Sequence, residues 1–268
     1  MPIQGTPQTV VHSTPSAILE RISLVLQAFE GPGRLNLAQV VRYTGLPRSS
    51  AHRMLERLVG MNWLNRQGNE YELGTRLMQL GSTAVYQNSV RRAAAPILHE
   101  LHRVTGYVVH LGVLDGSDVL YLEKIGGRLA AELPTRVGGR LPAHTSAIGK
   151  ALLACTPSGN DHLADFTPEL HKVREMGVSY DLHQMAGGIS TIAAPIGPAG
   201  GVVAALSICG PTAHLKFDYR HTTPVRLAAS AVLHAVSGKG RGGTVAIADH
   251  NRIALLPSPG RPPRLRFA

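Results

Sequence analysis

Residues 14–75 contain three short amphipathic segments separated by glycine-containing turns and followed by a hairpin pattern. The first segment runs from Thr14 to the stop at Gly31-Pro32-Gly33, with apolar residues at helical spacing. The second starts near Asn36, and the third runs from about Pro47 to Val59 after a tight turn. Two strand patterns within residues 63–73 then flank a turn. Three helices before a small hairpin form the order of a winged helix-turn-helix, which is a DNA-binding fold.

The third helix is expected to expose a basic and polar face. Its apolar residues Ala51, Leu55 and Leu58 point inward, which leaves the arginine, serine and histidine side chains outside. Such a mixture can read guanine edges in the major groove and bind phosphate at a helix N-terminus. The predicted DNA contacts are Arg48, Ser49, Ser50, His52, Arg53 and Arg57 on this helix, with Arg66 and Gln67 in the wing. A solvated basic face on a small helical bundle is the alternative interpretation.

The overall charge is a weaker argument for DNA binding than the placement of these residues. The formal net charge is +10, but residues 1–90 carry 8 basic and 5 acidic residues, whereas the last 32 carry 6 and 1. Residues 237–268 are therefore expected to form a disordered basic Gly/Pro/Arg-rich tail that adds nonspecific attraction to DNA. The two cysteines form no disulfide framework, and no signal peptide or membrane-spanning run is visible. These features indicate a cytoplasmic protein without a membrane partner.

The second half of the chain has the pattern of an α+β sensor domain. Helical periodicity covers residues 75–101 with a break near Asn88, and predominantly strand patterns follow. We expect strands at Tyr107–Leu114, Val119–Ile125, Leu129–Val137, Ile189–Ile196 and Gly201–Cys209, with helices at Ser146–Ala154 and Pro224–Val236. The predicted organisation is a disordered arm at 1–13, a winged helix-turn-helix at 14–75, a linker helix at 76–92, an effector-binding domain at 93–236 and the tail at 237–268. Strands and helices in this order suit a domain that encloses a small molecule.

The last predicted strand separates its residues into two faces. Strand alternation places Val203, Ala205, Ser207 and Cys209 on one face, which is small and weakly polar. Thr191 and Ala193 of the preceding strand are expected to share it. This face fits the floor of a ligand pocket in which Ser207 donates a hydrogen bond to a carboxylate. Small core residues would give the same pattern, so that alternative stays open.

Several separate motifs resemble the IclR family of transcriptional regulators. They are the turn and third helix at 45–55, Tyr71-Glu72-Leu73-Gly74, the loop and helix at 136–154, Ala193-Ala194-Pro195 and the run at 203–211. The resemblance implies a winged helix-turn-helix joined by a linker helix to a GAF-like α/β domain, which binds a small organic or aromatic acid and needs no cofactor. It implies effector contacts from Ala143, His144, Thr145, Asp181, Thr191, Ser207 and Cys209. Ser190 and Thr191 depart from the usual arginine and cysteine, and the segment 156–173 looks short.

The resulting hypothesis is a ligand-responsive regulator, with repression of a catabolic operon favoured over activation. A homodimer, or a tetramer of two dimers, would present two recognition helices to a pseudo-palindromic operator. The alternative classes are a small-molecule-processing enzyme and a ligand-binding module that acts only through protein partners. No G-x-S-x-G, P-loop or H-E-x-x-H motif is present. His99 and His102 lie on one helix face without a visible third ligand, so no metal site is predicted.

Overall fold

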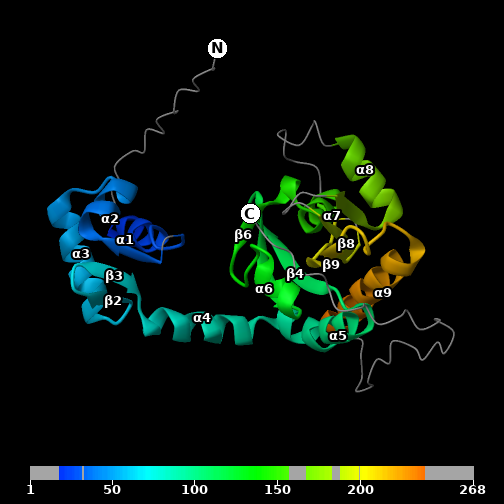
Figure 1. Cartoon of the computed structure of the whole chain (residues 1–268), viewed down its shortest axis with the longest axis horizontal. Helices are drawn as coiled ribbons and strands as arrows, with labels where there is room; N and C mark the ends of the chain where they lie inside the picture. The colour runs from blue at the N-terminus through cyan, green and yellow to red at the C-terminus, as the bar shows by residue number, and fades with distance from the viewer. Residues whose placement is uncertain (1–17, 32, 157–166, 183–187, 199, 239–268) are drawn as a thin grey trace, which may run out of the picture. The chain divides into compact units, whose positions relative to one another are not determined.

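The computed structural model describes residues 18–31, 33–156, 167–182, 188–198 and 200–238 (Figure 1). The chain divides into two compact units, residues 1–86 and 87–268, which are described separately below. The predicted arm at 1–13, the Thr14-Pro15 helix start and residues 239–268 of the predicted tail lie outside the described residues, as does most of the segment 156–173. No helix within the described ranges is long and apolar enough to cross a membrane.

The first unit is a winged helix-turn-helix followed by an extended helix. Three helices pack around a small core, and all three strands of the accompanying sheet are antiparallel in the order β1-β3-β2. Strand β1 was not expected from the sequence. The elements are α1 (Ile18–Gln27), β1 (Arg34–Asn36), α2 (Leu37–Thr44), α3 (Arg48–Gly60), β2 (Leu64–Gln67), β3 (Glu70–Leu73) and α4 (Thr75–Gln87).

Local capping explains the turn that positions α3. The Asn36 side chain accepts a hydrogen bond from the Gln39 amide at 3.0 Å, and the Gln39 side chain accepts one from the Asn36 amide at 2.8 Å. This capping box starts α2. Gly45, with φ of 67°, ends α2 in the left-handed conformation that favours glycine. Leu46 then enters the core and sets the start of α3.

The second unit is a six-stranded antiparallel sheet covered by helices on both faces. The strand order is β6-β5-β4-β9-β8-β7. Its elements are α5 (Ser89–Thr105), β4 (Val108–Asp115), β5 (Asp118–Ile125), α6 (Arg128–Glu132), β6 (Arg140–Pro142), the 3-10 turn η1 (Ala143–Thr145), α7 (Ala147–Cys155), α8 (Thr167–Met176), β7 (Ser179–Leu182), β8 (Ile189–Ile196), β9 (Ala204–Pro211) and α9 (Tyr219–Val236).

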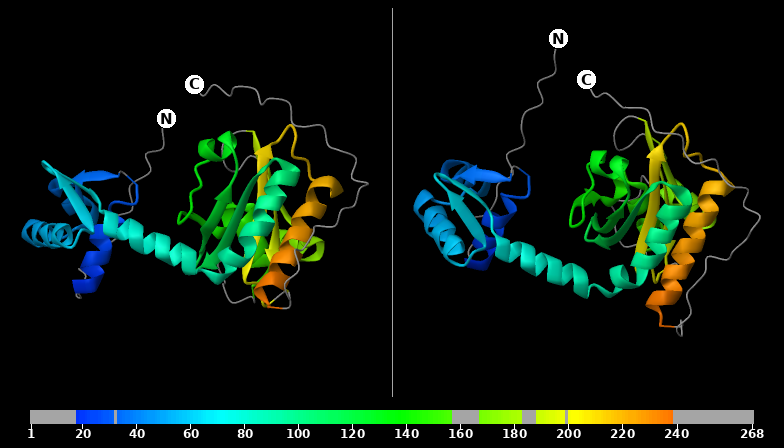
Figure 2. Two further views of the ribbon diagram at one scale, coloured as in Figure 1. Left: turned by 90° about the horizontal axis from the view of Figure 1, so that it is seen from below. Right: turned by 60° about the horizontal axis from the view of Figure 1, so that its bottom comes forward.

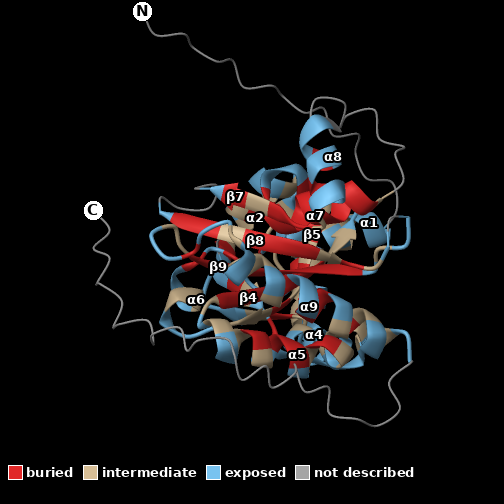
Figure 3. Cartoon of the chain, turned by 90° about the vertical axis from the view of Figure 1, so that its right-hand side faces the viewer, coloured by how far each residue is buried: buried red, intermediate tan, exposed pale blue. Residues whose placement is uncertain are grey.

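The two faces of this sheet bury different residues. Helices α5 and α9 lie side by side and pack on the face that carries Leu206 and Ile208 of β9 (Figure 2). Helix α7 packs on the opposite face, against Ala205 and Ala193. The strands are largely buried between these layers (Figure 3). The predicted alternation is confirmed from Ala205 onward, because Leu206 and Ile208 face α5 and α9 while Ala205 faces α7. The strand begins at Ala204 and not at Gly201, so Val203 lies outside it.

Two predicted elements of this unit were wrong. The strand expected at Leu129–Val137 is instead helix α6 followed by an irregular segment. Arg128 and Glu132 pair four residues apart at 3.2 Å and the intervening Leu-Ala-Ala favours helix, while Pro134 prevents its continuation. The last helix begins at Tyr219 and not at Pro224, because Asp218 caps the His221 amide. Strands β6 and β7 and helix α8 were not predicted.

Candidate functional site

Helix α3 presents the predicted DNA-binding face to solvent. Ala51, Leu55 and Leu58 are buried, as the sequence indicates. Arg48, Ser49, His52, Arg53 and Arg57 are exposed, and Ser50 is partly exposed. Within the described part of the chain, neither a hydrogen bond nor an ion pair engages the side chains of Arg48, Arg53 and Arg57. These three guanidinium groups therefore keep their donors available for phosphate oxygens or base edges.

The N-terminus of α3 adds an anion-binding feature to this face. Its N-cap is Pro47, which makes no side-chain capping hydrogen bond. The first amides of a helix have no acceptor inside the helix, so those at the start of α3 are left for a partner outside it. Together with the partial positive charge of the helix end, this arrangement suits a backbone phosphate.

The two predicted wing residues have different surroundings. The guanidinium of Arg66 bonds Glu56 of α3 at 3.0 Å and the Gly68 carbonyl at 2.9 Å. Tyr71 also donates to Glu56, at 3.0 Å. Arg66 thus ties the wing to α3 in this structure, while Gln67 is exposed beside the Gly68 turn. Their contacts with DNA stay a prediction.

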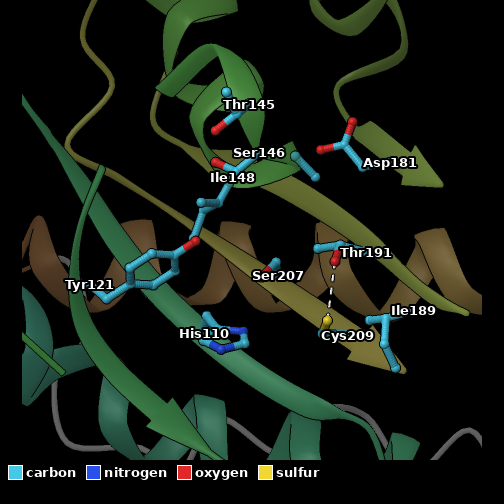
Figure 4. Close-up of a pocket in the computed structure, with 11 residues that line it drawn as sticks. His110, Tyr121, Thr145, Ser146, Ile148, Asp181, Ile189, Thr191, Ser207 and Cys209 are labelled. Carbon is cyan, nitrogen blue, oxygen red and sulfur yellow. Dashed lines mark hydrogen bonds between the residues drawn. The ribbon is translucent and has the colours of Figure 1, made fainter. Parts of the chain in front are cut away.

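The second unit contains a cavity between η1, the start of α7 and the α7-facing side of the sheet (Figure 4). Its volume is about 20 Å³, enough for about one water molecule. Residues from seven elements meet there. The lining residues are His110, Tyr121, Thr145, Ser146, Ala147, Ile148, Asp181, Ile189, Thr191, Ser207 and Cys209.

Strand register explains how distant residues reach this cavity. Asp181 of β7 pairs with Thr191 of β8, and Thr191 pairs with Cys209 of β9. In the neighbouring row, His110 of β4 pairs with Ser207 of β9. Directly paired residues on one face of a sheet lie close enough for their side chains to touch. Thr191 and Cys209 do so, with 3.1 Å between Oγ1 and Sγ (Figure 4).

Buried Lys150 on α7 supports the side of the cavity that Asp181 forms. Its ammonium group bonds Asp181 at 2.7 Å and Glu169 of α8 at 2.9 Å. Burial raises the pKa of Asp181, and the hydrogen bond and charge of Lys150 oppose that rise. Burial alone would lower the pKa of Lys150, but bonding to the two carboxylates raises it overall. The charge of Asp181 is thereby balanced within the protein.

The other polar groups of the cavity are neutral near pH 7. Burial, together with the charge of Lys124, lowers the pKa of His110 to about 3. Burial raises the pKa of Tyr121 to about 12, against an opposing hydrogen bond with Ser146. Burial likewise raises the pKa of Cys209 to about 11. Apart from Asp181, which pairs with Lys150, the described lining residues are therefore uncharged, and the cavity offers an acid mainly neutral donors.

The start of α7 supplies further donors to the cavity. Ser146 is the N-cap and accepts a hydrogen bond from the Gly149 amide at 3.2 Å. The next two residues, Ala147 and Ile148, line the cavity at the first turn, where helix amides have no intrahelical acceptor. A Cβ atom on Gly149 would lie 2.0 Å from the Ala143 carbonyl oxygen, so glycine allows η1 to lie directly on α7. A helix N-terminus against a polar cavity can bind a carboxylate.

Five of the seven predicted effector contacts lie around the cavity, namely Thr145, Asp181, Thr191, Ser207 and Cys209. The structure does not bring the other two into its lining. Ala143 is buried beneath α7, and His144 is exposed on η1. Ser190 points away from the cavity row and bonds Thr212 at 2.8 Å. Effector binding by any of these residues stays a prediction.

Sequence reasoning missed His110 and Tyr121. The one available signal was a single histidine inside the apolar run Val108–Leu111. The α5 histidines His99 and His102 bond the Ala95 and Tyr107 carbonyls at 2.8 and 2.7 Å. No group of three potential metal ligands occurs among residues whose placement is described.

Comparisons with known proteins agree with this architecture. The model of the IclR helix-turn-helix domain matches residues 18–68, and that of the bacterial transcriptional regulator IclR C-terminal domain matches residues 82–234. The HTH-type transcriptional regulator XynR of Escherichia coli strain K12 is 32% identical over 71% of this chain and 84% of its own length. The HTH-type transcriptional repressor AllR of Salmonella typhi is 28% identical over 75% of this chain and 82% of its own.

Solved structures give the same result. A crystal structure of an IclR homolog complexed with 4-hydroxybenzoate, from Microbacterium hydrocarbonoxydans, is 26% identical, with a TM-score of 0.70. The match covers 83% of this chain and 100% of that one. The fold and the α3 face define a helix-turn-helix transcriptional regulator, and the similar proteins are named as regulators and not as enzymes. The chain belongs to the IclR family of transcriptional regulators.

Proposed function

We propose that this regulator represses an operon for the breakdown of a small organic or aromatic acid, and that the acid binds in the cavity beneath α7. One observation carries the proposal. The chain has exposed arginines on α3 whose side chains make no hydrogen bond or ion pair with the described residues, and it also has a cavity lined by neutral donors. The AllR repressor supports repression, and the homolog complexed with 4-hydroxybenzoate supports an acid effector. As a DNA-bound regulator it would act in the cytoplasm.

The size of the cavity suggests how binding could act on the protein. A volume of about 20 Å³ is too small for an organic acid, so the lining side chains must move when one enters. An acid would then bind the opened arrangement more tightly than the closed one. Such a difference in affinity is what allows a ligand to shift a conformational equilibrium.

We further propose that the active form is a homodimer or a dimer of dimers. Helix α4 supports this, since none of its residues is buried in the single chain. Met78 and Tyr86 are 71% and 73% exposed, and Leu80 is also exposed. Apolar side chains gathered on one exposed helix are typical of an interaction surface. A two-fold assembly would match a pseudo-palindromic operator.

Operator binding is tested with Arg53→Ala in a mobility-shift titration on promoter-proximal DNA. If Arg53 makes a bidentate base contact, binding should weaken by about 1–3 kcal/mol. Arg103→Ala is the matched control, since Arg103 is an exposed arginine of α5 that bonds Glu100. It should leave the titration unchanged. The absence of any salt-sensitive shift by the unmodified protein would refute operator binding.

Acid binding is tested by thermal unfolding with a panel of small organic and aromatic acids. The acid that stabilises the unmodified protein should stabilise Ser207→Ala less, because the stabilisation by a ligand at fixed concentration grows with its affinity for the folded state. Ser230→Ala, at an exposed position on α9, is the control. An unchanged shift in Ser207→Ala would remove Ser207 from the site.

A further inference from the structure

His110 is a buried polar side chain that forms part of the cavity wall. It lies in the middle of β4, has 2% of its surface exposed and packs edge-on against Tyr121, with 5.4 Å between ring centroids. Its ring faces the cavity from the side of the sheet that also carries Ser207 and Cys209 (Figure 4). Both His110 and Tyr121 come from strands that carry none of the predicted effector contacts.

The two ring nitrogens of His110 have different surroundings. Nε2 lies 2.8 Å from the hydroxyl of Thr135. For Nδ1, the described residues provide no hydrogen-bond partner. Buried polar atoms in proteins are nearly always paired. His110 lines the cavity, so a ligand that enters it can supply a bond to Nδ1.

The segment that carries Thr135 is itself held in place. The Lys124 ammonium group bonds the Leu133 carbonyl at 3.0 Å and also bonds the Thr135 carbonyl. Lys124 pairs with His110 across the strands β4 and β5. The ring of His110 is consequently fixed by a hydrogen bond whose other partner is anchored, and a fixed donor or acceptor discriminates better between ligands.

The chemistry of the ring selects the ligand group. Because His110 stays neutral near pH 7, one of its nitrogens carries a proton and the other a lone pair. A hydroxyl group can both donate and accept, so it satisfies Nδ1 in either tautomer. A second carboxylate can only accept, and it would find no charged histidine to balance it.

We propose that His110 is a specificity-determining residue that recognises the hydroxyl group of a hydroxylated carboxylic acid. The carboxylate would lie at the start of α7 and Ser207, with the hydroxyl group directed to Nδ1. This inference rests on the proposed function, since it concerns the second end of the same acid. It assigns His110 and Thr135 to the discrimination between hydroxylated acids and their deoxy counterparts.

The test measures acid affinity by calorimetry on the full chain with two matched pairs, 4-hydroxybenzoate with benzoate and lactate with propionate. The hydroxylated member of the pair that binds should bind about 3- to 10-fold more tightly, as expected for one neutral hydrogen bond. His110→Phe keeps an aromatic ring against Tyr121 but removes both nitrogens. It should bring the two affinities to within about 2-fold.

Two further variants make the result specific. Ser207→Ala should weaken both members of a pair and keep their ratio, because it acts on the carboxylate end. Thr135→Val keeps the volume of the side chain and removes the partner of Nε2, so it should reduce the ratio. This variant decides the question if His110→Phe does not fold, as judged by circular dichroism.

The measurements distinguish a failure of the proposed acid sensing from a failure of the proposed role of His110. If none of the four acids binds, the proposed acid sensor fails and this inference fails with it. If acids bind but the hydroxylated and deoxy members have equal affinity, acid sensing stands and the role of His110 is overturned. The role of His110 is also overturned if His110→Phe still prefers the hydroxylated acid by the same factor. If His110→Phe does not fold, an unchanged preference in Thr135→Val overturns it.

Discussion

Individual buried polar residues decide the chemistry of the cavity, and the burial of His110 makes the stability of the fold depend on pH. Its pKa falls from 6.5 to about 3 on burial. The unfolded chain therefore binds more protons than the folded chain between pH 6.5 and 3. The stability that comes from the neutral buried ring is complete above pH 6.5 and is lost as the pH falls through this window.

We predict that His110→Phe reduces the acid sensitivity of folding. Chemical denaturation of the unmodified chain should show the free energy of unfolding falling by up to about 1.4 kcal/mol per pH unit more steeply below pH 6.5 than in the variant. His99→Phe is the control, because His99 is exposed on α5. Equal slopes for the unmodified chain and His110→Phe would show that folding does not lower the pKa of His110.

At the scale of elements, a group of buried and half-buried charges in the second unit joins α7, α8 and β7. Lys150 and Asp181 are both buried and lie 2.7 Å apart, and Glu169 completes the group from α8. An ion pair in such a position adds little net stability over apolar residues, but removing one partner leaves a buried charge. The position of Asp181 beside the cavity thus depends on a residue of another element.

We predict that Lys150→Met lowers the free energy of unfolding by about 3–5 kcal/mol in urea denaturation. The double variant Lys150→Met/Asp181→Leu should recover most of this loss, because it removes both charges. Lys172→Met, an exposed lysine of α8, should change stability by less than about 0.5 kcal/mol. If the double variant is no more stable than the single one, the uncompensated charge is not the cause.

At the scale of the whole molecule, the proposed switch links acid binding to operator binding. Thermodynamic linkage requires the effect to be reciprocal, so operator DNA must change the affinity for the acid by the same factor by which the acid changes the affinity for the operator. This factor is typically about 5- to 150-fold. The requirement holds whether the regulator represses or activates.

We predict that the acid changes the affinity for the operator by the same factor by which operator DNA changes the affinity for the acid. Operator affinity is measured by fluorescence anisotropy with and without saturating acid, and acid affinity by calorimetry with and without operator DNA. The His110→Phe variant should need more acid to reach the same shift in operator affinity. An acid affinity that operator DNA does not change would separate the cavity from DNA binding and contradict the proposed switch.

Local patterns in the sequence were enough to predict the winged helix, the buried and exposed faces of α3 and β9, and the break between helices at Asn88. Helix caps, glycine turns and residue periodicity act within a few residues, so they can be read along the chain. The confirmed faces followed from that periodicity: α3 buries Ala51, Leu55 and Leu58, and β9 directs Ser207 and Cys209 to the cavity.

Only the tertiary structure decided which residues meet at the cavity. His110 and Tyr121 reach the cavity from β4 and β5, and strand register places His110 beside Ser207 of the distant strand β9. Thr135, in an irregular segment, reaches His110 through a hydrogen bond. The segment at Leu129–Val137 formed helix α6 and an irregular stretch where the sequence predicted a strand, and Thr135 in that stretch bonds His110. Burial then set the protonation of His110, a property that exists only once the chain has removed the ring from water.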